Sequence, residues 1–139
     1  MVIKVSTARS FEPEVTRAFR FLVAEHALTG PSSTGPTQVF YTGPEVAYTI
    51  TFDPAGHTVT TSVARDVGAV RLTADLPALV VSAALGHPAM VPCTARTLLE
   101  MRAAILTQAH YVRRLQPYLT PLNVVPLMRA AHAQELRSA

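Results

Sequence analysis

The chain has 139 residues, of which 49% are hydrophobic and only 15% are charged, and its mean hydropathy is +0.25. Soluble domains are about a quarter charged, so the surplus apolar surface predicts a large core, an internal cavity or a partner-binding surface. No apolar run reaches the ~18 residues of a membrane span and we recognise no signal peptide, so we expect a cytoplasmic protein without a membrane span.

Positive charge is concentrated in the last third of the chain. Residues 1–90 carry six basic and seven acidic side chains, whereas residues 91–139 carry six basic and two acidic ones. Arginine greatly outnumbers lysine, which is typical of a GC-rich bacterial genome. The single cysteine, Cys93, excludes an intrachain disulfide and is consistent with a reducing compartment.

The first third predicts a strand, a helix and a loop. Residues 1–8 alternate apolar and polar side chains, which favours a strand. A helix is predicted over 13–28, because Pro13 suits a first helical turn and apolar residues then recur at helical spacing. The helix is expected to stop at Gly30, and the Gly-, Pro- and Ser-rich segment 30–36 is typical of a loop.

The middle third predicts an antiparallel meander with short connections. Its alternating segments are separated by turn signals, of which Asp53–Gly56 is the strongest. The predicted strands cover residues 38–42, 45–52, 57–65 and 69–76. For residues 79–85 the sequence leaves strand and helix open, because two valines favour a strand and several alanines favour a helix.

The last third predicts a long amphipathic helix and a shorter one. The long helix is expected to begin at an N-cap, Thr94, and to end before Pro117. Its predicted apolar stripe consists of Leu98, Met101, Ile105, Ala109 and Val112, widened by Leu99, Leu106 and Leu115. A second helix is predicted over 126–136, with an alternative start at Thr120.

These elements predict one α+β domain over residues 1–139, with an N-terminal β-α unit and an antiparallel meander packed on the long helix. The stretch from Val5 to Phe21, a strand followed by a helix that begins at a proline, resembles the start of the helix-grip fold of the SRPBCC superfamily. That superfamily includes START lipid-transfer domains, pollen-allergen-like proteins and polyketide cyclases. The similarity is one of layout over residues 1–118, and a helical extension over 119–139 follows it. The resemblance implies a cavity between sheet and helix that accepts an apolar small molecule.

A search for catalytic motifs finds no nucleotide-binding glycine pattern, P-loop, paired-cysteine motif or hydrolase signature. A nucleophile hypothesis would pair Cys93 with His87 or His110, but a lone cysteine is more often a small buried hydrophobe. The five histidines lack the short spacing of a metal site. We therefore predict no metal and no cofactor, and we favour a protein that is not an enzyme.

Three functions remain as hypotheses. The first is binding of a hydrophobic or amphipathic small molecule in a pocket lined by Tyr48, Ile50, Phe52, Met101, Ile105 and Val112. The second is an interaction protein that acts through a homodimer or partner interface, formed by the region from Pro121 to Leu136. The third is nucleic-acid binding, for which a net charge of +3 is weak support. Its candidate residues are Tyr111, Arg113, Arg114 and Arg129.

Overall fold

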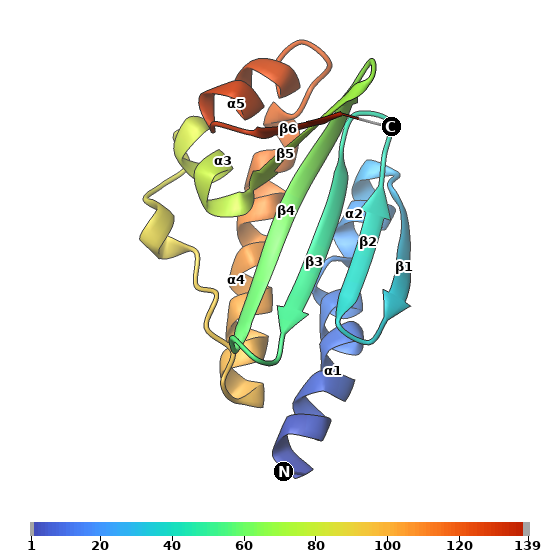
Figure 1. The fold of residues 1–139 in the computed structure, drawn as a ribbon, viewed down its shortest axis with the longest axis vertical. Helices are drawn as coiled ribbons and strands as arrows, with labels where there is room; N and C mark the ends of the chain where they lie inside the picture. Colours follow the sequence, from blue (N-terminus) through green and yellow to red (C-terminus); the bar gives the residue numbers. More distant parts are fainter. Residues whose placement is uncertain (1, 138–139) are drawn as a thin grey trace.

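A computed structural model describes residues 2–137, with side chains from residue 7 onward. It is an α+β structure in which helices cover one face of an antiparallel sheet (Figure 1). The helices are α1 (Val2–Ala18), α2 (Arg20–His26), α3 (Leu76–Ser82), α4 (Leu98–Leu115) and α5 (Val124–Ala130). The strands are β1 (Thr29–Gly35), β2 (Gln38–Thr42), β3 (Ala47–Asp53), β4 (Thr58–Val67), β5 (Val70–Asp75) and β6 (Gln134–Arg137).

The six strands follow one another across the sheet in chain order, each antiparallel to the next. All four predicted meander strands are confirmed, as β2 to β5. The core side of β3 shows why: Tyr48, Ile50 and Phe52 are buried, while the residues between them are half-buried. This two-residue period is the signal that the sequence carries. The ambiguous segment 79–85 lies largely in a helix, α3.

The predicted N-terminal strand is wrong, because α1 already starts at Val2. The helix has its own four-residue period: Thr7, Phe11 and Val15 are all buried, and the buried Phe19 directly after the helix continues the spacing. Pro13, predicted as a helix start, lies inside α1 on its exposed side. The alternating residues of segment 1–8 favour a strand locally. The buried residues that follow, Phe11 and Val15, pack at helical spacing on the sheet and on α4, and this packing stabilises the helix instead. Met1 lies outside the described residues.

The Gly- and Pro-rich segment 30–36 is not a loop but largely an edge strand, β1. Its pairing with β2 has two irregularities in register, one on each side of the Ser32–Ser33 pair. An edge strand tolerates proline, because an absent backbone N–H costs nothing where it would face solvent. This explains how turn-forming residues are accommodated in β1.

The predicted C-terminal helix over 126–136 is only half correct. Helix α5 ends at Ala130, and the chain turns at His132, which has a φ of 58°. It then returns as β6, which pairs with β5, so the expected helical extension also supplies the sixth strand (Figure 1). Within residues 2–137, no helix is both long enough and apolar enough to cross a membrane.

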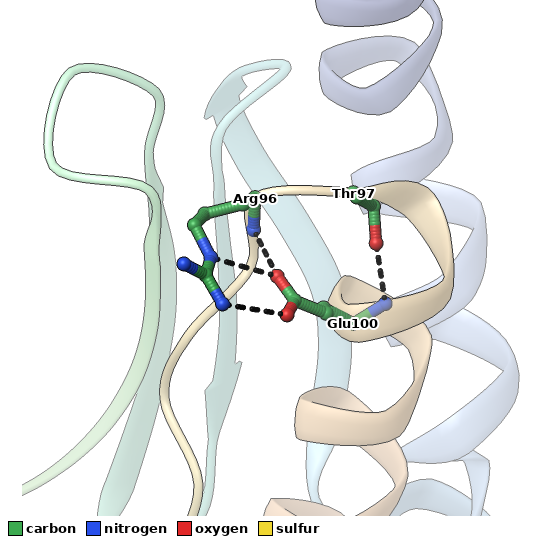
Figure 2. Close-up of polar contacts among 3 residues, drawn as sticks. All are labelled: Arg96, Thr97 and Glu100. Atoms are coloured by element: carbon green, nitrogen blue, oxygen red, sulfur yellow. Dashed lines mark hydrogen bonds and ion pairs between the residues drawn. The ribbon is translucent and has the colours of Figure 1, made fainter.

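Helix α4 begins one turn later than predicted, with Thr97 rather than Thr94 as its N-cap. The hydroxyl of Thr97 accepts a hydrogen bond from the backbone N–H of Glu100 at 3.1 Å (Figure 2). The carboxylate of Glu100 in turn accepts from the backbone N–H of Arg96 at 2.9 Å and from its guanidinium (Figure 2). These hydrogen bonds from Arg96 hold the pKa of Glu100 below its usual value. The cap from Thr97 and the contact from Glu100 back to the residue before the cap together fix where the helix starts.

We predict that Thr97→Ala lowers the free energy of unfolding by about 1 kcal/mol, because it leaves a backbone N–H of the first turn without its acceptor. The matched control is Thr94→Ala, which removes an exposed hydroxyl nearby and should change stability by less than about 0.5 kcal/mol. Urea denaturation followed by circular dichroism measures both. Equal losses in the two variants would contradict the N-cap assignment.

Candidate functional site

The six residues predicted to line a pocket are brought together, but as part of the packed core. Three come from β3 and three from α4, and each is at most 4% exposed. They meet α1 as well: the ring of Phe52 stacks on that of Phe11, with centroids 5.8 Å apart. Other side chains thus pack against the positions predicted as pocket walls.

Two buried tyrosines on the sheet, Tyr41 and Tyr48, differ in whether their hydroxyl groups are hydrogen-bonded. Tyr48 Oη donates to Gln116 Oε1 at the end of α4, whereas Tyr41 Oη has no hydrogen-bond partner in the described part of the chain. Burial raises the pKa of Tyr41 to about 12 and raises that of Tyr48 as well. Both phenols therefore stay protonated at neutral pH, and neither is poised as a base.

Gln108 is the one polar residue among the buried, described residues of α4, and no role was predicted for it from the sequence. Its Oε1 accepts from Thr61 Oγ1 at 2.7 Å, and its Nε2 donates to the carbonyls of Val59 and Pro92, both at 2.8 Å. Beside it lies a cavity of about 110 Å³, lined also by Val91 and Cys93. Small-molecule pockets hold roughly 300–1,000 Å³. The cavity therefore does not favour a ligand pocket of the predicted kind.

The nucleic-acid candidates are largely engaged within the protein. Tyr111, predicted to be free for base stacking, is only 8% exposed, with the Arg114 guanidinium 5.8 Å from its ring. The guanidinium of Arg113 lies 4.8 Å from the ring of Phe21 and pairs with Glu25 at 2.5 Å. Arg129 is exposed on α5. The stacking platform that this hypothesis needs is thus absent at Tyr111.

Two leucines predicted to widen the core stripe of α4 are instead exposed. Leu99 is 76% exposed and Leu106 is 60% exposed, whereas Leu115 is buried as expected. The two exposed leucines are seven residues apart and therefore lie on the same side of the helix. They form an apolar row that the fold does not cover.

Leu106 borders an open groove where α1 and α2 meet α4. We call it the α1–α4 groove; its volume is about 360 Å³. Its walls are formed by Arg17, Ala18, Arg20, Phe21, Ala24, Glu25, Leu106, Ala109, His110 and Arg113. Two ion pairs join α4 to α1 and α2 beside the groove: Arg102 contacts Glu14 at 2.9 Å, and Arg113 contacts Glu25.

The α1–α4 groove is positively charged. It has three arginines and one glutamate among its lining residues. Arg113 is paired with that glutamate, and Arg17 contacts Glu14 at 3.6 Å. Arg20 makes no ion pair within the described residues. The groove thus combines an apolar floor with an excess of cationic groups, and it contains no nucleophile beside a base.

Comparisons with family models, with curated proteins and with solved structures find no match to this chain. The predicted meander and long helix are present, but the initial strand on which the resemblance to the helix-grip fold rested is a helix, α1. Among the described residues, no group of three or more histidine, cysteine or acidic side chains is placed to hold a metal ion.

The two tyrosines give a matched pair of variants. Tyr48→Phe should lower the free energy of unfolding by about 1 kcal/mol, because it removes a hydrogen bond and leaves Gln116 without its donor. Tyr41→Phe should leave stability unchanged or raise it, since it removes a buried hydroxyl without a partner. Thermal and urea unfolding test the pair, and a larger loss for Tyr41→Phe would overturn the assignment.

Gln108→Leu should lower the free energy of unfolding by about 1–3 kcal/mol. It keeps the side-chain size but leaves the buried Thr61 hydroxyl and the carbonyls of Val59 and Pro92 without their hydrogen-bond partner. Adding Thr61→Val should recover part of that loss by removing the stranded hydroxyl. A double-mutant cycle measured by urea unfolding reports the coupling directly. Simple additivity of the two losses would show that the Thr61–Gln108 hydrogen bond contributes nothing.

Proposed function

We propose that this protein is a non-catalytic interaction module that binds an acidic, amphipathic helical segment of a partner protein in the α1–α4 groove. The observation that carries the proposal is the exposed side chain of Leu106 within a groove walled by arginines. Exposed apolar residues rimmed by charge are typical of surfaces that bind other proteins.

The apolar part of the surface fits a helix. Leu99 and Leu106 are separated by two helical turns, about 10 Å along α4. An amphipathic helix that lies along a groove presents its own apolar side chains at the same spacing. A partner helix of about four turns would cover the distance from Leu99 to Arg113.

The charges decide the chemistry of the occupant. Arg17 and Arg113 already contact Glu14 and Glu25, whereas Arg20 makes no ion pair within the described residues. Acidic side chains on the flanks of a partner helix therefore gain favourable contacts, above all at Arg20. A second copy of this chain, docked groove to groove, would bring the same excess of positive charge and be repelled. An acidic segment of a different protein is therefore the favoured occupant.

Binding of a small apolar molecule remains a prediction from the sequence. The side chains expected to line its pocket are packed core residues, and the cavity beside Gln108 is small. Nucleic-acid binding is likewise less favoured, because Tyr111 is buried. The interaction hypothesis is retained, with its surface moved from the C-terminal region to the helical face.

A designed fluorescent peptide tests this function. We expect a four-turn helix with leucines on one side and glutamates on its flanks to bind with a Kd in the micromolar range, with weaker binding as salt rises. The same peptide with lysines in place of glutamates should bind at least tenfold more weakly. Fluorescence anisotropy at several salt concentrations measures both affinities.

Variants of the protein locate the binding surface. Leu106→Ser should weaken binding of the acidic peptide about tenfold, because it removes a central apolar contact. The double variant R17E/R20E gives the groove an excess of acidic groups, so it should weaken binding of the acidic peptide and reverse the salt dependence. Leu122→Ser is the matched control, since Leu122 is 88% exposed but lies outside the groove. Equal binding of both peptides, or equal effects of the two leucine variants, would refute the proposal.

A further inference from the structure

The two edges of the sheet differ in how well they are protected against pairing with another strand. Edge strand β1 contains Pro31 and has irregular register with β2. Proline and bulges are common devices that block further pairing. Edge strand β6 has neither: its four residues, Gln134–Arg137, pair with β5 in unbroken register and are all exposed. Its outer edge is therefore available to another strand.

The side chains of β6 are complementary to themselves. Glu135 and Arg137 flank Leu136 and lie on the same face of the sheet, because strand residues two apart point the same way. Leu136 lies on the other face, is 53% exposed and is opposite Arg71 of β5. The strand thus has one acidic and one basic residue at equal distances from a central leucine.

We infer that β6 pairs antiparallel with β6 of a second copy of this chain, about a two-fold axis at Leu136. In this register Leu136 is opposite its symmetry mate, and Glu135 of each copy is opposite Arg137 of the other. Two opposite-charge cross-strand pairs and one apolar pair then form together. The six-stranded sheets of the two copies join into one continuous sheet.

This interface is independent of the α1–α4 groove, because none of the residues that line the groove lies in β6. It also depends on different chemistry, since both signs of charge occur on the same strand. A failure of peptide binding at the groove would therefore leave the dimer proposal standing, and the reverse also holds.

Charge reversal tests the proposed register. We expect sedimentation velocity to show the native chain passing from monomer to dimer as concentration rises. Glu135→Arg places arginines opposite one another, and Arg137→Glu places glutamates opposite one another; each should weaken the dimer at least tenfold. The double variant E135R/R137E restores opposite charges across the axis and should recover the native affinity.

Mixing the two single variants gives the sharpest result. E135R and R137E chains are complementary to each other in this register, so their equimolar mixture should form heterodimers although neither forms homodimers. Glu12→Arg, an exposed charge reversal on α1, is the control and should dimerise normally. Three results would each overturn the proposal: a native chain that stays monomeric, single variants that dimerise normally, or a mixture that stays monomeric. Thermal unfolding checks that every variant is folded.

Discussion

The buried amide of Gln108 fixes how α4 lies on the sheet. It joins the helix to Thr61 and Val59 of β4 and to Pro92 in the segment that leads into α4. Each helical residue turns the chain by about 100°, so a single side chain held in one direction sets the direction of all others. Met101 and Leu115 are each seven residues from Gln108 and lie within about 20° of it, at the centre of the buried face.

The same rotation determines which side of α4 faces outward. Leu99 and Leu106 lie about 180° and 160° from Gln108, so both are on the side of the helix that points away from it. They cannot join the core unless the amide leaves its three partners, a change that strands buried polar groups. The exposed apolar row, and with it the α1–α4 groove, is therefore a consequence of the hydrogen bonds on the other side of the helix.

The sequence predicted the sheet well because alternation in β2 to β5 and the turn after Asp53 are local signals. It missed α1, whose deciding residues, such as Phe11 and Val15, require the later parts of the chain to pack against. It missed β6 because a four-residue edge strand whose residues are all exposed has no alternation of buried and exposed side chains from which to predict it. The groove was missed because the apolar stripe predicted on α4 was chosen by hydrophobicity alone. It therefore left out the buried Gln108 and included the exposed Leu99 and Leu106, so the predicted core face of the helix was rotated away from the observed one.

The two proposed interfaces together make a bivalent assembly. Pairing at β6 occupies one edge of the sheet, whereas the groove lies where α1 and α2 meet α4, on elements that contact β2, β3 and β4. Two copies joined through β6 therefore keep two open grooves that carry the same charge. Such a dimer would hold two acidic segments at once, and a partner that is itself dimeric would be bound more tightly than a single segment. Avidity of this kind allows two shallow interfaces, each weak alone, to give a stable complex.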